Sequence, residues 1–91
     1  MNSSVAVIYS RAALKFLKKL DSDTATRIYN KIEENSQQSN PLARATALQG
    51  ALSGKYRYRI GDYRAIFTID NDKQVRLLSV SSIKHRKDIY S

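Results

Sequence analysis

The chain has 91 residues, of which 16 are Lys or Arg and 8 are Asp or Glu, so its formal net charge is +8. This length fits one domain with a single core and excludes two, so residues 1–91 are treated as one domain. With no cysteine and a single histidine, the sequence excludes disulfides and a thiol nucleophile and argues against any metal site.

The charge and hydropathy patterns indicate where the protein works. A chain this basic attracts nucleic acid or acidic proteins, with an affinity that falls as salt rises. No apolar run approaches the roughly 18 residues of a membrane span, and the N-terminus does not resemble a signal peptide. We therefore expect a cytoplasmic protein with a polyanionic or acidic partner and no membrane contact.

The first half of the chain predicts one strand and two helices. Residues 5–9 are largely β-branched and predict a strand, after which Ser10 can cap a helix. Asp21 can cap the next helix, so the two form a helical hairpin that fades near Pro41. The apolar stripes at helical spacing are Ala13, Phe16, Leu17 and Leu20, then Ala25, Ile28, Tyr29 and Ile32.

The second half predicts strands. Residues 42–48 could form a short helical turn, and Gly50 and Gly54 bracket a loop. From Lys55 the apolar period changes to two, which predicts strands near 55–60, 63–69 and 74–82. The fold class is therefore α+β: a short N-terminal strand, a two-helix hairpin and an antiparallel three-stranded β-meander, with the helices on one face of the sheet.

The segment KYRYRIGDYRAIF, residues 55–67, alternates tyrosine and arginine around a Gly-Asp turn. With Gly61-Asp62 as a two-residue loop, Arg59 faces Arg64 and Arg57 faces Ile66. The three arginines then share one sheet face. The opposite face holds Tyr56, Tyr58, Ile60, Tyr63, Ala65, Phe67 and Ile69.

Placing Arg59 directly across from Arg64 is destabilising by itself, because like charges repel across a strand pair. The arrangement is explained if an anion lies between the guanidinium groups, and the planar fork of arginine suits phosphate. The alternative is a solvated face whose arginines extend along neighbouring side chains into water.

The segment near the C-terminus adds further cations. It carries Lys84, His85, Arg86 and Lys87, followed by Tyr90. His85 normally titrates near neutral pH, although a lone histidine is usually neither catalytic nor a ligand. The basic run could also be a solvated tail.

These motifs resemble those of the RelE/ParE toxin superfamily. The stretch LQGALSGKYRYRIGDYRAIFTI and the terminal IKHRKDIY together cover its hairpin and C-terminal patterns. The matching residues are Leu52, Gly54, Tyr56, Arg57, Gly61, Asp62, Tyr63, Arg64, His85, Arg86, Asp88, Ile89 and Tyr90. The terminal motif is similar to that of the RelE branch, the mRNA interferases of type II toxin–antitoxin systems.

The resemblance implies a toxin that cleaves mRNA in the ribosomal A site and so inhibits translation. It implies attack by a 2′-hydroxyl, which leaves a 2′,3′-cyclic phosphate and a 5′-hydroxyl and needs no cofactor. The implied partners are an acidic RelB-like antitoxin, the ribosome with its mRNA, and promoter DNA bound through the antitoxin complex.

The resemblance also implies roles for individual residues. Arg57, Arg59, Arg64 and Arg86 would stabilise charge, and Tyr90 would transfer a proton or stack on a base. The RelE pattern has lysines where this chain has Arg57 and Arg59, and arginine does not act as a base. Either Tyr90 or His85 would therefore handle the proton. The candidate RNA-binding lysines are Lys55, Lys84, Lys87, Lys15, Lys18 and Lys19, the last three of which could equally be a solvated helix face.

Three other functions fit the same residues. The first is a ParE-like inhibitor of DNA gyrase, which binds its target without cleaving RNA. The second is a non-catalytic module that neutralises nucleic-acid phosphates with its basic sheet. The third is an inactive toxin that still binds its antitoxin. Strand scission and its loss on Tyr90 substitution would separate the nuclease from these alternatives.

Overall fold

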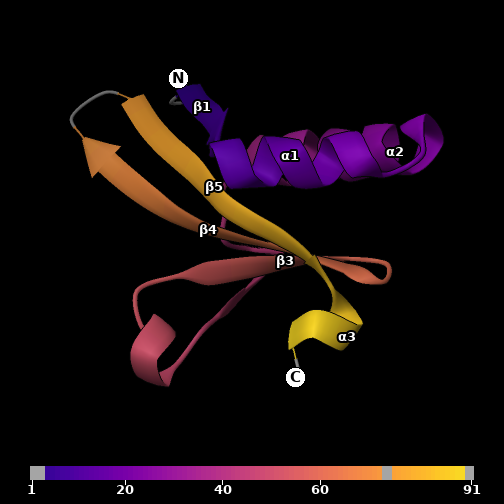
Figure 1. Ribbon diagram of the computed structural model, residues 1–91. Coiled ribbons are helices and arrows are strands. Elements are labelled where there is room, and N and C mark those ends of the chain that lie inside the picture. Colours follow the sequence, from indigo (N-terminus) through magenta and orange to yellow (C-terminus); the bar gives the residue numbers. More distant parts are fainter. Residues whose placement is uncertain (1–3, 73–74, 90–91) are drawn as a thin grey trace.

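A computed structural model describes residues 4–72 and 75–89 of the chain (Figure 1). The helices and strands, in chain order, are β1 (Ser4–Tyr9), α1 (Arg11–Lys19), α2 (Ser22–Ser36), β2 (Ala45–Ala47), the 3₁₀ helix η1 (Gly50–Leu52), β3 (Tyr56–Ile60), β4 (Tyr63–Asp72), β5 (Val75–His85) and α3 (Arg86–Ile89). None of the helices in this part of the chain is long and apolar enough to cross a membrane.

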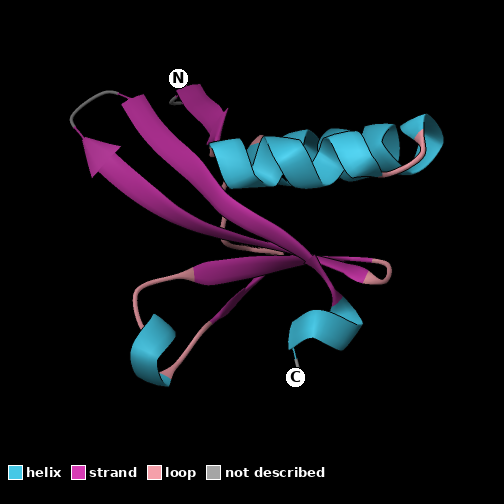
Figure 2. Cartoon of the chain, in the orientation of Figure 1, coloured by secondary structure: helices cyan, strands magenta, loops and turns pink. Residues whose placement is uncertain are grey.

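The strands form one 5-stranded sheet in the order β1-β5-β4-β3-β2. The predicted α+β class and the antiparallel meander of β3, β4 and β5 are confirmed. The sheet is larger than the predicted meander because β1 joins β5 in parallel and β2 joins β3 antiparallel. Figure 2 shows α1 and α2 running together on one side of the strands, with the short α3 apart from them.

Both predicted helix caps are present. The Ser10 hydroxyl accepts the backbone N–H of Ala13 at 3.0 Å and donates to the carbonyl of Ser81 at 2.7 Å, so it ties α1 to β5. At the start of α2, the side chain and backbone N–H of Thr24 donate to Asp21. These hydrogen bonds hold the pKa of Asp21 below its usual value. Both caps satisfy backbone donors that a helix start leaves without partners.

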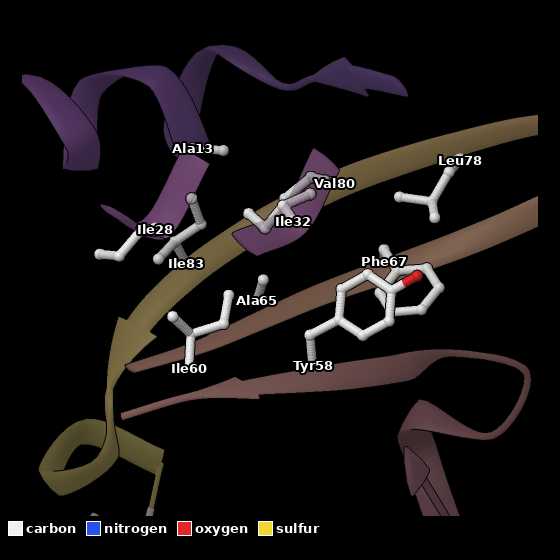
Figure 3. Packing of buried hydrophobic residues seen from close by; sticks show 10 residues of the cluster. All are labelled: Ala13, Ile28, Ile32, Tyr58, Ile60, Ala65, Phe67, Leu78, Val80 and Ile83. Carbon is white, nitrogen blue, oxygen red and sulfur yellow. The ribbon is translucent and has the colours of Figure 1, made fainter. Parts of the chain in front are cut away.

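The core lies between the two long helices and the sheet (Figure 3). Its buried apolar residues are Ala13, Ile28, Ile32, Tyr58, Ile60, Ala65, Phe67, Leu78, Val80 and Ile83. Tyr29, predicted as part of the apolar stripe of α2, is instead 46% exposed and stacks on Tyr9 with ring centroids 5.7 Å apart. The face opposite the helices, called the outer face below, carries the arginines of β3 and β4.

A bulge in β5 changes the alternation of its side chains. Ile66 pairs with Ser82 and Phe67 pairs with Val80, so Ser81 is an extra residue in β5. Val80 and Ile83 therefore both point into the core although they are three residues apart. The bulge lets β5 continue to His85, beyond the predicted end near residue 82.

Residues 42–48 do not form the predicted helical turn. A turn at Asn40, whose side-chain oxygen accepts the N–H of Leu42 at 3.0 Å, leads instead into the short strand β2. Ala45–Ala47 pair with residues 56–58 of β3. Pairing with an existing strand satisfies the backbone groups of β2, and this outweighs the local helix preference of its alanines.

Tyr58 fixes the segment before β2 from within the core. Its buried hydroxyl donates to the carbonyl of Pro41 at 2.7 Å. Burial raises the pKa of Tyr58 to about 12. Since removing the hydroxyl leaves the Pro41 carbonyl without its donor, Tyr58→Phe should lower the free energy of unfolding by about 1–3 kcal/mol.

The same substitution should change the alkaline stability of the protein. A raised folded-state pKa means that Tyr58 contributes stability below pH 10.0, the ordinary value, which is lost as pH rises through about 12. In urea titrations across this range, the wild type should lose stability more steeply than Tyr58→Phe. Equal slopes for the two proteins would contradict the burial of the neutral phenol.

Candidate nucleic-acid interface

The β3–β4 hairpin has the predicted register. Gly61 and Asp62 form the loop, and Arg59 pairs directly with Arg64. Gly61 has φ 58°, a left-handed conformation that side chains with a Cβ disfavour. The side chains of Arg57, Arg59 and Arg64 therefore leave the sheet on its outer face, as alternation requires.

Replacing Gly61 tests how much stability depends on a residue that tolerates the left-handed conformation of this turn. An added Cβ at Gly61 meets no atom within 4 Å, so the cost of Gly61→Ala is backbone strain alone. We expect a loss of about 1–2 kcal/mol in the free energy of unfolding, measured in urea. Gly61→Asn, which tolerates the left-handed conformation better, should cost less. Equal losses for Ala and Asn would contradict this explanation.

The register adds a third cation to the arginine pair. On β5, Lys84 pairs with Arg64. Its neighbour Ile83 is buried in the core, so Lys84 points to the outer face. Arg59, Arg64 and Lys84 thus lie side by side on three adjacent strands about 4.8 Å apart, and we call them the cationic row. The sequence predicts Lys84 as an RNA-binding residue but does not indicate that it pairs with Arg64.

The members of the cationic row differ in exposure. Arg59 and Lys84 are exposed, whereas Arg64 is only 6% exposed. The Arg64 guanidinium donates to the carbonyls of Gly61 and Tyr63, both at 2.9 Å, and so folds back on its own turn. Arg64 therefore stiffens the turn and adds positive charge beneath the surface, while Arg59 and Lys84 can reach a ligand directly.

The start of α3 is attached to the same turn. The Arg86 backbone N–H donates to the Asp62 carbonyl at 2.7 Å, and the Arg86 Nε lies 3.6 Å from Asp62 Oδ1. This places Arg86 next to the hairpin that carries the cationic row. The sequence predicts no role for Asp62 beyond the turn. Its acidic charge within a basic segment is the feature that could have indicated a contact with Arg86.

His85 faces away from the cationic row. It pairs with Tyr63 on β4, and the two rings meet edge to face with centroids 5.2 Å apart. Tyr63 in turn contacts Phe16 of α1, so His85 lies on the side of the helices. Its Nδ1 accepts the Lys87 N–H at 3.2 Å, in the manner of a cap for α3. Tyr90 lies outside the described residues.

The other candidate lysines fall into two groups. Lys55 immediately precedes β3 and is half-buried, and Lys87 is exposed on α3. The remaining three, Lys15, Lys18 and Lys19, are exposed on α1, in the helix layer that covers the opposite face of the sheet. One phosphate group cannot contact both groups at once. The structure thus separates candidates that the sequence had left together.

The chemistry of this surface is that of anion binding. Neither the cationic row nor the adjacent cross-strand set of Arg57, Ile66 and Ser82 contains an acid. Across residues 4–72 and 75–89, no three histidine or acidic side chains gather closely enough to hold a metal ion. Guanidinium and ammonium groups so arranged can bind a phosphate and stabilise added negative charge on it.

Solved structures of several toxins and toxin–antitoxin complexes have a similar fold. The toxin–antitoxin complex RelBE2 from Mycobacterium tuberculosis has TM-score 0.75 and 21% identity, over 94% of this chain and 100% of that one. The RelB–RelE complex from Methanococcus jannaschii gives 0.66 and 28%, over 92% and 95%. The DinJ–YafQ complex from E. coli gives 0.58 and 16%, over 97% and 100%.

Sequence comparison gives a family match. No curated protein matches the sequence. Residues 7–90 match the family described as the ParE toxin of type II toxin–antitoxin systems, parDE. The superfamily resemblance seen in the hairpin and C-terminal motifs is therefore confirmed. Since the match spans nearly the whole chain, this protein belongs to the ParE toxin family, within the RelE/ParE superfamily of type II toxins.

Proposed function

We propose that this toxin is a ribosome-dependent endoribonuclease that cleaves mRNA in the A site. The observation that carries the proposal is the cationic row, in which Arg59, Arg64 and Lys84 lie directly across from one another on adjacent strands. Such a row costs stability through like-charge repulsion. A bound phosphate would remove that cost and would gain charge-assisted hydrogen bonds.

In the proposed reaction an RNA 2′-hydroxyl attacks the adjacent phosphorus in line. The bond from phosphorus to the 5′-oxygen breaks, leaving a 2′,3′-cyclic phosphate and a 5′-hydroxyl. The attacking hydroxyl loses its proton and the leaving oxygen gains one. The phosphorane carries more negative charge than the substrate, and Arg59, Lys84 and Arg86 would contact it while Arg64 and Arg57 contribute charge from the sheet.

We assign proton transfer to Tyr90, with His85 as the second candidate. Histidine is the side chain used most often for general acid–base catalysis. The His85 ring, however, packs on Tyr63 on the helix side of the sheet and caps α3 through Nδ1. Proton transfer contributes roughly 10²–10⁴-fold, so placement on the ribosome together with the cations would still leave substantial catalysis without a good base.

We further propose that a cognate acidic antitoxin of the RelB kind neutralises the toxin. Solved structures of similar fold from M. tuberculosis, M. jannaschii and E. coli are toxin–antitoxin complexes. The net charge of +8 on this chain suits an acidic partner. The antitoxin complex would also bind promoter DNA. Because the proposed substrate is mRNA on the ribosome, the toxin would act in the cytoplasm.

The test is primer extension on a reporter mRNA in a reconstituted translation system. The wild type should give discrete cuts within A-site codons, and Tyr90→Phe should reduce them by roughly 10²-fold or more. His85→Gln should have the smaller effect of the two. Intact mRNA in the presence of folded wild-type toxin would refute the nuclease. Equal losses in both variants would leave cleavage standing but remove the assignment of the proton to Tyr90.

Inhibition of DNA gyrase is the second candidate function. Two observations favour it: the matched family is described as ParE, and Arg64 is only 6% exposed, with its guanidinium bound to two turn carbonyls. A gyrase inhibitor would stabilise cleaved DNA in a supercoiling assay and leave mRNA intact. A nuclease would give the reverse result, so the two assays run in parallel separate the functions.

A further inference from the structure

A groove of about 520 Å³ lies between α2 and the turn end of β3. Its walls include Arg27 and Lys31 of α2, Arg59 of β3, and the turn residues Gly61 and Asp62. The groove exists because β2 pairs with β3 only as far as Tyr58, which leaves the last two residues of β3 without a neighbouring strand on that edge. Arg59 therefore belongs both to the cationic row and to this groove.

The two cations on α2 are spaced along one face of the helix. Arg27 and Lys31 are four residues apart, so they rise about 6 Å along the axis on the same side. This separation is of the same order as that between successive phosphates of an extended single strand. Ile28 and Ile32, one position further along, are fully buried and anchor this part of α2 to the sheet. The cations are thus held by a rigid element.

Two of the carboxylates near the groove already lie close to cations. Asp62 lies 3.6 Å from Arg86, across the turn. Lys31 pairs with Glu34 at 3.1 Å, but Glu34 also accepts from Arg44 at 2.9 Å. All of these pairs are exposed, and exposed pairs contribute little free energy. An incoming phosphate could therefore compete with Glu34 for Lys31 at small cost.

We propose that this groove binds the phosphates of an RNA strand that continues from the cationic row, around the open end of β3, onto α2. The inference rests on the proposed function in taking RNA as the ligand of the row. Arg59 is the residue shared by the two surfaces, and Arg27 and Lys31 are binding residues that take no part in the chemistry. The lysines of α1 border a different part of the helix layer and lie outside this path.

The experiment measures binding separately from cleavage. The probe is a single-stranded RNA oligonucleotide with every 2′-hydroxyl methylated, which cannot be cut by attack of that hydroxyl. Its Kd for the full-length toxin is measured by fluorescence anisotropy over a series of KCl concentrations. The variants are Arg27→Gln, Lys31→Gln and the double variant, and the matched control is Arg11→Gln, which removes one exposed positive charge at the start of α1. Circular dichroism verifies that each variant is folded.

Each lost phosphate contact should reduce the slope of log affinity against log salt by about 0.7, so the double variant should lose about 1.4. Arg11→Gln should leave the slope near that of the wild type. Equal slopes for the control and the groove variants would overturn the proposal. So would unchanged RNA binding together with weaker binding of a polyglutamate peptide, which would make the groove a site for an acidic protein.

Failure of the nuclease proposal gives a different result. If the toxin binds the methylated RNA through Arg27 and Lys31 but leaves mRNA intact on the ribosome, the groove proposal stands and the catalytic assignment is wrong. If the wild type cleaves mRNA but the groove variants bind the methylated RNA with the wild-type salt dependence, the catalytic assignment stands and the groove proposal is wrong.

Discussion

In the proposed nuclease reaction, Arg59→Ala should lower the rate of A-site cleavage by roughly 10²–10³-fold, because it removes an exposed cation proposed to contact the phosphorane. Lys84→Ala should have an effect of similar size, since both residues flank Arg64 on the outer face. Arg59→Lys should recover part of the activity, because it restores the charge but not the planar fork. Single-turnover cleavage on stalled ribosomes measures all three rates.

The stability of the same variants provides the control. Removing one member of a like-charge row relieves repulsion, so Arg59→Ala and Lys84→Ala should unfold in urea at the same concentration as the wild type or a higher one. A loss of cleavage activity without a loss of stability in these variants would indicate that the cationic row serves function rather than folding. Unchanged cleavage in both variants would show that the row does not act on the scissile phosphate.

Phe67→Ala should lower the free energy of unfolding by about 3–5 kcal/mol. Phe67 is fully buried at the centre of the sheet, with its ring centroid 4.3 Å from that of Tyr58 and 5.9 Å from that of Tyr56. Truncation leaves a cavity in the core between β4 and the helices, where Phe67 packs. Small domains have only about 5–15 kcal/mol in total, so we expect a partly unfolded protein at 37 °C.

Urea denaturation followed by circular dichroism measures this loss. The matched control is Leu52→Ala, an apolar truncation at a residue that is 44% exposed in η1, and it should cost less than about 1 kcal/mol. Similar losses at Phe67 and Leu52 would contradict the assignment of the core to the space between the helices and the sheet.

The helices and the hairpin could be predicted because their signals are local. Ser10 and Asp21 are residues that commonly cap helices, and they predict the starts of α1 and α2. Gly61-Asp62 fixes the register of β3 and β4 through a two-residue loop. β2 could not be predicted, because Ala45–Ala47 carry little strand signal of their own and depend on β3 for their pairing partner. The end of β5 was missed because Ser81 interrupts its two-residue period.

The candidate site was predictable in its charges but not in its geometry. Alternation along the strands, combined with the two-residue loop at Gly61-Asp62, put Arg57, Arg59 and Arg64 on one face. The sequence did not indicate that the Arg64 guanidinium donates to the carbonyls of Gly61 and Tyr63, because only the folded turn brings these carbonyls within reach. The placement of Lys84 and of His85 on opposite faces likewise depends on how far β5 extends.

The position of β5 has a consequence for when the toxin can first act. This strand follows every other strand in the chain, yet it lies inside the sheet, between β1 and β4. A nascent chain that has emerged only as far as β4 has neither the partner of β1 nor Lys84. Pairing β1 with β5 also closes a loop of nearly the whole domain, which is slow relative to local hairpin formation. A partly synthesised toxin therefore lacks both the completed sheet and the cationic row, by topology alone.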